Sequence, residues 1–145
     1  MIKLVNKYRY FEGTVASKED LFSVGANYFV FGSNLQAIHG SGSAKVAREV
    51  FGAKNRGIFH RFTSTTSYAI PTKKTPYEKM SIEDITQHIN CFKEDAEDNY
   101  THCDTFLVTQ VGCGLAGYTA KDIAPLFRGS PSNCIFDIAW KQYLE

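Results

Sequence analysis

The fold is decided by the stretch Tyr28-Phe29-Val30-Phe31-Gly32-Ser33-Asn34 and by His39-Gly40-Ser41-Gly42-Ser43-Ala44-Lys45, which follows it. The four apolar residues from Tyr28 to Phe31 predict a strand that is buried on both faces. A polar, glycine-rich loop then runs from Ser33 to Gly42. Apolar residues recur at helical spacing from Ser43 to Phe51, and Gly52 follows as a helix-ending residue. The stretch therefore predicts a strand, a glycine-rich loop and a helix in succession.

The rest of the chain continues this alternation of strands and helices. Before the stretch we predict one or two edge strands within residues 3–16 and a helical turn at 18–22. After it we predict a strand at 67–70 that Pro71 stops, a helix from the N-cap Ser81 to about Asn99, a strand at 105–109, a helix at 119–127 kinked or split at Pro125, and a final strand or docked tail at 135–140. Such alternation predicts an α/β fold with a largely parallel sheet.

Length and composition set the broad class. The chain has 145 residues, which argues for a single domain over residues 1–145. Sixteen Lys and Arg against fifteen Asp and Glu leave a net charge of +1, so a dedicated nucleic-acid binder is disfavoured. We see no signal peptide and no apolar stretch that could span a bilayer, and we expect a cytoplasmic protein. The four cysteines lack metal-binding spacing, so we predict reduced thiols, no metal site and no cofactor.

Two glycine-rich loops follow predicted strands and lead into predicted helices. One spans residues 32–42 and the other runs from Gly112 to Tyr118. Ligands of such sheets bind beyond the carboxyl ends of the strands, where both loops should lie. Glycines let the backbone approach a ligand, and free amides at a helix N-terminus favour an anion. No acidic residue occurs at 21–44 or 105–120, so the sequence predicts a phosphate site.

Several motifs keep a second interpretation. The first loop matches neither a P-loop nor a dinucleotide-binding fingerprint, so a simple strand-to-helix turn stays open. Cys113 lacks the glycines that a nucleophile elbow places two residues away on each side. We interpret it as a small residue in a tight turn. His39 and Asn34 are either ligand contacts or residues that hydrogen-bond within their own loop. We interpret Lys73 and Lys74 as a solvated basic loop, and residues 94–98 as a solvated acidic helix face.

The order of these motifs resembles a known family. The residues that carry the resemblance are Phe31-Gly32-Ser33-Asn34-Leu35, Ile38-His39-Gly40-Ser41-Gly42-Ser43-Ala44, Ser67-Tyr68-Ala69-Ile70-Pro71-Thr72-Lys73, Val111-Gly112-Cys113-Gly114-Leu115-Ala116-Gly117-Tyr118 and Asp122-Ile123-Ala124-Pro125-Leu126-Phe127. Together they cover about residues 28–127 and resemble small, mostly phage and bacterial proteins of unassigned function, which in turn look like divergent macro domains. The resemblance implies a phage origin, hence a host cytoplasm, and a mixed sheet between two helical layers.

Macro domains bind ADP-ribose, so the resemblance also implies a ligand and its site. By similarity, the first loop holds the distal ribose and a phosphate, and the second wraps the diphosphate. The implied binding residues are Gly32, Ser33, Asn34, Gly40, Ser41, Gly42, Ser43, Gly112, Cys113, Gly114, Leu115, Ala116, Gly117 and Tyr118. Alternating Gly and Ser replace the family's run of glycines, and only Glu19 and Asp20 are candidates for its adenine-binding acid. The ligand is therefore expected to be ADP-ribose or a related nucleotide, including a cyclic or modified one.

Three functions remain open at this point. The chain binds an ADP-ribose-like ligand without turnover, hydrolyses ADP-ribose linkages, or acts as a host-takeover factor that uses the fold for protein interaction without a ligand. For hydrolysis, Asn34 would position the distal ribose and His39 is the only nearby titratable side chain. One amide and one histidine form a small catalytic set, so we favour binding.

Overall fold

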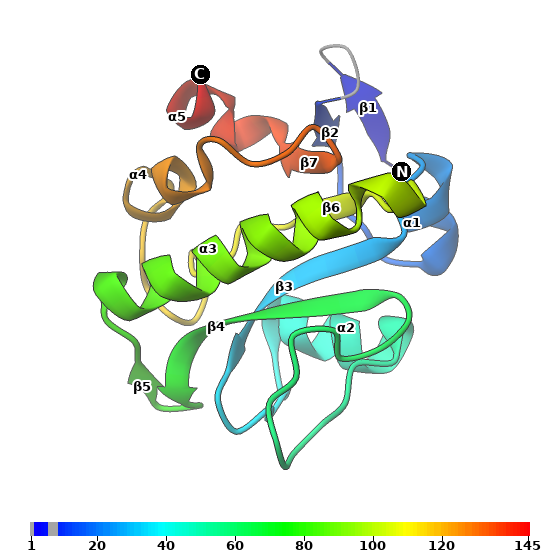
Figure 1. The fold of residues 1–145 in the computed structure, drawn as a ribbon. Helices are drawn as coiled ribbons and strands as arrows, with labels where there is room; N and C mark the ends of the chain where they lie inside the picture. Colours follow the sequence, from blue (N-terminus) through cyan, green and yellow to red (C-terminus); the bar gives the residue numbers. More distant parts are fainter. Residues whose placement is uncertain (1, 6–8) are drawn as a thin grey trace.

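The computed structural model describes residues 2–5 and 9–145, and it contains a seven-stranded mixed sheet (Figure 1). The strands are β1 (Lys3–Val5), β2 (Tyr10–Glu12), β3 (Tyr28–Asn34), β4 (Ser67–Thr75), β5 (Glu78–Lys79), β6 (Phe106–Val108) and β7 (Cys134–Asp137). Their order is β1-β2-β7-β6-β3-β4-β5. The five central strands pair in parallel, whereas β1 and β5 pair antiparallel at the two edges. The predicted α/β fold with a largely parallel sheet is confirmed.

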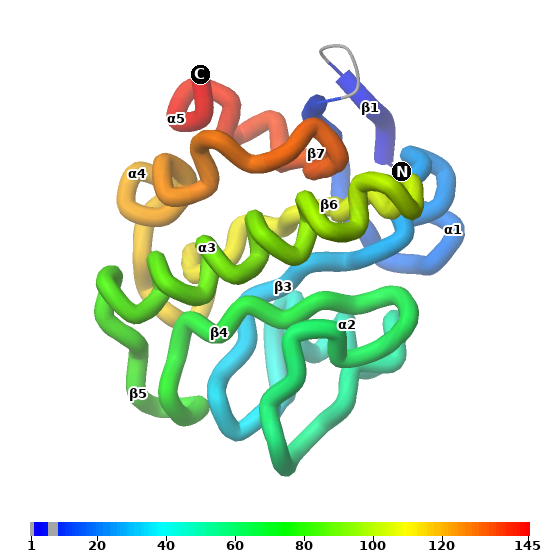
Figure 2. Tube along the Cα trace, viewed as in Figure 1, coloured from blue at the N-terminus to red at the C-terminus, as the bar shows by residue number. Residues whose placement is uncertain are grey.

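Helices cover both faces of this sheet (Figures 1 and 2). They are α1 (Lys18–Ser23), α2 (Gly42–Phe51), α3 (Ile82–Asp98), α4 (Ala120–Ile123) and α5 (Lys141–Leu144), with 3-10 turns η1 (Tyr100–His102), η2 (Ala124–Phe127) and η3 (Ile138–Trp140). One core cluster joins Val30 of β3 to α3, η2 and η3. The other joins Phe29 and Phe31 to α1 and α2. Alternate residues of β3 thus face opposite helical layers, as expected for a strand buried on both faces.

The main helices begin and end where their sequences indicate. The Ser81 hydroxyl accepts a hydrogen bond from the backbone N–H of Asp84 and so caps α3. Four apolar residues of α3 at helical spacing are fully buried on the sheet: Ile85, Ile89, Phe92 and Ala96. Gly52 ends α2 in the left-handed conformation at φ +73°. The helix expected at 119–127 is split, because η2 begins just before Pro125.

The prediction that Pro71 stops a strand is wrong, because β4 continues through it to Thr75. The backbone N–H of Ala69 points away from β3, where it donates to the Arg61 carbonyl at 2.8 Å. Two residues later, the nitrogen of Pro71 points the same way, to a side where β5 has not yet begun. The missing N–H therefore leaves no ladder hydrogen bond unmade, as for a proline on an edge.

Three other features of the fold differ from the predictions. β3 extends through Ser33 to Asn34, so the first loop begins later than expected. One or two edge strands were predicted within residues 3–16, but β2 is interior, because it pairs with both β1 and β7. The acidic face predicted at 94–98 is not fully solvated, since the Asp95 side chain is 15% exposed and accepts hydrogen bonds from Arg61 and Tyr68. This contact ties the irregular segment 53–66 to α3.

Within the described part of the chain, no helix combines the length and the apolar character needed to cross a membrane.

Candidate functional site

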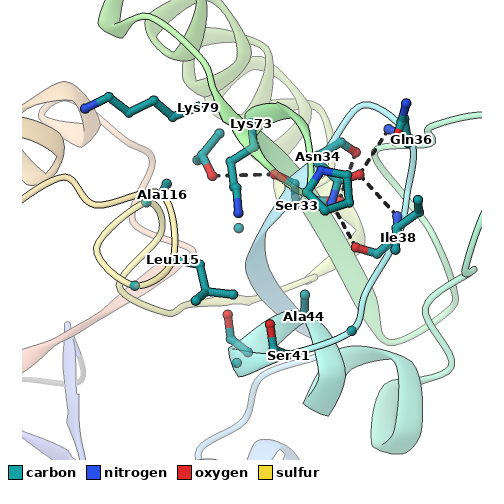
Figure 3. A pocket seen from close by; sticks show the side chains of 18 of the residues that line it. Ser33, Asn34, Gln36, Ile38, Ser41, Ala44, Lys73, Lys79, Leu115 and Ala116 are labelled. Carbon is teal, nitrogen blue, oxygen red and sulfur yellow. Dashed lines mark hydrogen bonds between the residues drawn. The ribbon is translucent and has the colours of Figure 1, made fainter.

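A cavity of about 890 Å³ opens at the carboxyl ends of β3 and β4, as predicted for ligand sites of such sheets (Figure 3). Both glycine-rich loops contribute to its wall. The predicted site residues that line it are Gly32, Ser33, Asn34, Gly40, Ser41, Gly42, Ser43, Gly112, Gly114, Leu115 and Ala116. The structure therefore brings together two loops that lie about seventy residues apart in the sequence.

The second loop packs closely against β3. A Cβ on Gly32 would lie 3.4 Å from the backbone nitrogen of Gly112. Gly112 itself has φ +79°, and a Cβ there would approach the Ile123 side chain at 3.3 Å. Glycine at 112 is required by both its backbone conformation and the contact with Ile123. This close packing sets the width of the cavity between the two loops.

The N-terminus of α2 forms the opposite wall. Gly42, Ser43 and Ala44 line the cavity with the first turn of the helix. The side chain of the N-cap residue Ser41 makes no capping hydrogen bond, and the first turn carries no acidic residue. The amides of this turn and the positive end of the helix dipole therefore border the cavity, where they favour an anion.

Three cationic residues in the described part of the chain also line the cavity: Arg56, Lys73 and Lys79. The ammonium of Lys79 lies 4.5 Å from the centroid of the Tyr118 ring, and Figure 3 shows this side chain directed away from the space between the loops. None of the described residues in its lining carries a carboxylate. Figure 3 shows Lys73 reaching from β4 into the space between the two loops. The prediction of a solvated loop is therefore wrong for Lys73, whereas Lys74 is exposed and pairs with Glu78 at 3.7 Å. The wall has the charge expected for a phosphate site.

Asn34 uses its side chain to close its own loop. Its Nδ2 donates to the carbonyl of Ile38 at 2.8 Å. Its Oδ1 accepts from the backbone N–H groups of Gln36 and Ile38, both at 3.1 Å (Figure 3). Of the two interpretations left open for Asn34, the structure shows the loop-forming one. Asn34 also lines the cavity, and one Nδ2 proton remains for a ligand.

His39 lies behind the cavity wall and is only 1% exposed. Its Nε2 lies 2.8 Å from the hydroxyl of Ser33, and its backbone N–H donates to the side chain of Asn55. Burial lowers the pKa of the ring; the backbone of Lys54 opposes this and the charge of Arg48 reinforces it. His39 is therefore neutral at pH 7 and does not line the cavity, although the sequence predicted it at the mouth of the loop.

Stability is expected to fall as pH drops below the ordinary histidine value. Burial also lowers the pKa of His88. Between the unfolded value of about 6.5 and the lower folded values, the unfolded chain binds more protons, so acid favours unfolding. Each of these histidines contributes a slope of at most about 1.4 kcal/mol per pH unit. Urea unfolding measured across this range checks the prediction.

The matched variants are His39→Gln and His88→Gln, which should each flatten the pH dependence of the unfolding free energy. His60→Gln is the control, because His60 is exposed. An unchanged slope in both test variants would contradict the assignment of this dependence to the rings of His39 and His88.

Three predicted residues of the second loop lie outside the cavity lining. Cys113 borders a smaller adjoining hollow of about 270 Å³, and burial raises the pKa of its thiol to about 11, so it is a poor nucleophile. Gly117 donates its backbone N–H to Gly114 at 3.0 Å and turns the loop. Tyr118 donates its hydroxyl to the Met80 carbonyl, with Lys79 Nζ 4.5 Å from its ring centroid. Tyr118 thus braces the second loop against β5.

Sequence reasoning missed about half of the lining. The lining residues that were not predicted as site residues are Gln36, Ile38, Ala44, Arg56, Thr72, Lys73, Pro76, Tyr77, Lys79 and Gln110. Most come from the irregular segment and from the β4–β5 hairpin, whose path depends on tertiary packing. Glu19 and Asp20, the candidates for an adenine-binding acid, lie in the first turn of α1 and do not line the cavity. The described residues contain no group of three or more potential metal ligands.

Comparison with known proteins yields a structural likeness. No family model matches the chain, and no curated protein matches it in sequence. A solved structure described as Thermosipho africanus DarTG in complex with ADP-ribose superimposes with a TM-score of 0.56 at 14% identity. The match covers 80% of this chain but 39% of the other, so this chain spans about two fifths of that protein's length. The likeness confirms the α/β fold.

Proposed function

We propose that this chain binds ADP-ribose, or a related nucleotide diphosphate that includes cyclic and modified forms, in the cavity between its two glycine-rich loops. The observation that carries the proposal is the make-up of the wall. Loop backbone, a helix N-terminus and the cationic residues Arg56 and Lys73 line it, without a carboxylate among the described residues. That combination suits a diphosphate, which offers many acceptor oxygens and negative charge.

The cavity also has room for more than a phosphate group. Its volume of about 890 Å³ lies within the range typical of sites for drug-sized and nucleotide-sized ligands. Apolar Leu115, Ala116 and Ile38 line it beside the polar groups. The structural relative named above was solved with ADP-ribose, which supports this choice of nucleotide.

Binding without turnover is the function that the geometry favours over hydrolysis. The amide oxygen and one amide proton of Asn34 make hydrogen bonds within its own loop, and His39 lies behind the wall. A reaction at an ADP-ribosyl bond needs a positioned water and usually a group that accepts a proton. Neither of the two residues considered for catalysis offers a free titratable group at the cavity surface.

ADP-ribose is expected to raise the thermal stability of the protein. At ten times its dissociation constant, a ligand that binds only the folded state adds about 1.4 kcal/mol of stability. For a chain of this length the melting temperature should rise by roughly 3–5 °C. Differential scanning fluorimetry with a series of ADP-ribose concentrations, followed by isothermal titration calorimetry, measures the effect.

Adenosine and ribose 5-phosphate serve as controls, because each lacks the diphosphate and should shift the melting temperature less. The absence of a shift with millimolar ADP-ribose, its cyclic forms, ADP and NAD would rule out the nucleotide proposal. It would favour a role in protein interaction without a ligand.

A further inference from the structure

The smaller hollow of about 270 Å³ that adjoins the cavity differs from it in charge. Ser43, Gln110 and Gly114 line both spaces, so a ligand in the cavity can extend into the hollow. The other lining residues in the described part of the chain are Thr109 and Cys113. None of these five carries a charge near neutral pH, since burial raises the pKa of the Cys113 thiol to about 11. The hollow therefore suits a neutral, polar part of a ligand rather than a phosphate.

A carboxylate holds the side chain of Gln110 at the junction of the two spaces. Gln110 follows β6 and Asp137 ends β7, and the parallel pairing of these strands brings the two residues together. The Nε2 atom of Gln110 donates to Oδ2 of Asp137 at 3.0 Å. Asp137 is held in turn, because its Oδ1 accepts from the backbone N–H of Ala139 at 3.0 Å. An amide oxygen cannot donate to a carboxylate, so this contact determines which end of the amide faces Asp137.

The contact with Asp137 leaves two hydrogen-bonding groups on Gln110. Within the described residues its Oε1 accepts no hydrogen bond, and one Nε2 proton is also unused. An amide acceptor beside an amide donor matches adenine, in which the amine at the six-position stands beside a ring nitrogen that accepts. A purine with a carbonyl at the six-position would instead turn an acceptor toward Oε1, which is unfavourable.

The other glutamine that lines the cavity has no such anchor. The backbone N–H of Gln36 donates to Asn34, but its side chain makes no hydrogen bond among the described residues. Either end of this amide can therefore turn toward a ligand, and Gln36 cannot distinguish a donor from an acceptor. It is a matched control for Gln110.

We propose that the smaller hollow is the subsite for the base of the nucleotide, and that Gln110, positioned by Asp137, selects a purine with an amine rather than a carbonyl at its six-position. This inference rests on the proposed nucleotide function. The volume of the hollow lies below the range typical of sites for whole drug-sized ligands, so it receives one part of the ligand. The cationic cavity beside it receives the diphosphate and the remaining sugar.

Calorimetric titration with ADP-ribose and with inosine diphosphate ribose tests the selection, because the second ligand carries a carbonyl where the first carries the amine. Wild type should bind ADP-ribose about tenfold more tightly, as expected for a glutamine that contacts adenine through both ends of its amide. Gln110→Leu should reduce this ratio to about twofold or less. Asp137→Asn should reduce it as well, since an asparagine amide can donate to Oε1 and so lets the Gln110 amide turn over. Gln36→Leu should keep the ratio of wild type.

Two further measurements restrict the test to the base. Ribose 5-diphosphate is ADP without its base, so wild type and Gln110→Leu should bind it with equal affinity. In the complex with ADP-ribose, NMR contacts between the adenine protons and the Thr109 methyl group should place the base in the hollow. Gln110 is exposed, so its replacement leaves the core unchanged. Asp137 caps η3, a role that asparagine also fills, and circular dichroism checks the fold of Asp137→Asn.

The outcomes separate this proposal from the proposed function. Equal affinity of wild type for the two dinucleotide-like ligands would overturn the base subsite while leaving nucleotide binding intact. A ratio that stays at the wild-type value in Gln110→Leu or in Asp137→Asn would overturn it too, as would a ratio lowered equally by Gln36→Leu. Failure of wild type to bind ADP-ribose at all would instead refute the nucleotide function.

Discussion

Replacing Gly114 with aspartate is expected to lower the affinity for ADP-ribose about 100-fold, which corresponds to about 2.7 kcal/mol. Gly114 lines the cavity in the second loop. A Cβ at this position would meet no atom within 4 Å, and its φ lies outside the left-handed region. The aspartate should therefore fold normally while it places a carboxylate beside the diphosphate, where like charges repel strongly. Isothermal titration calorimetry measures the loss.

Two matched variants separate charge from size at this position. Gly114→Asn has nearly the shape of the aspartate without its charge, and Gly114→Ala adds only a methyl group. Both should stay closer to wild type than the aspartate does. If Gly114→Asp binds ADP-ribose as wild type does, the second loop is not part of the diphosphate site.

Replacing Gly112 with valine is expected to destabilise the fold by about 3 kcal/mol. A left-handed backbone is unfavourable for residues with a Cβ, and costs roughly 1–2 kcal/mol. Added atoms in a packed site cost a further 1–3 kcal/mol or so. Gly112 has φ +79°, and its Cβ would press on Ile123 at 3.3 Å and on Thr72 at 3.5 Å. Urea unfolding followed by circular dichroism measures the change.

The control lies two residues further along the same loop. Gly114→Val has open space around its Cβ, and its unfolding free energy should lie within about 0.5 kcal/mol of wild type. Equal losses in both variants would show that the loop tolerates no side chain at all, rather than that Gly112 is the constrained position.

The sequence predicted those parts of the fold that local patterns determine. Hydrophobic spacing and caps located α2 and α3, as the fully buried Ile85 and the left-handed Gly52 show. Pro71 misled the prediction, because its effect depends on which way its nitrogen points and on where β5 begins. Neither is visible in the residues around it, since both follow from pairing with distant parts of the chain.

The candidate site was likewise predicted only where local sequence patterns determine it. Glycine content located both loops, and the scarcity of acidic residues around them predicted a wall without carboxylates. The cations could not be placed, because Arg56 and Lys79 reach the cavity from an irregular segment and an edge hairpin. Lys73 was predicted to lie in a solvated loop because Pro71 was predicted to end the strand before it. Asn34 lines the cavity, whereas His39 lies behind its wall, because the hydrogen-bond partners of both residues depend on the folded path of the chain.

The start of α3 confines the positive charge of the cavity to its wall. The helix begins beside β5 at the cavity end, where its first turn carries exposed Glu83 and Asp84, and it runs back across the sheet from there (Figure 1). The cavity lining itself holds three cationic residues and, among the described residues, no carboxylate. In a chain of net charge +1, an anion is therefore attracted over a short range at the cavity and not by that whole end of the molecule.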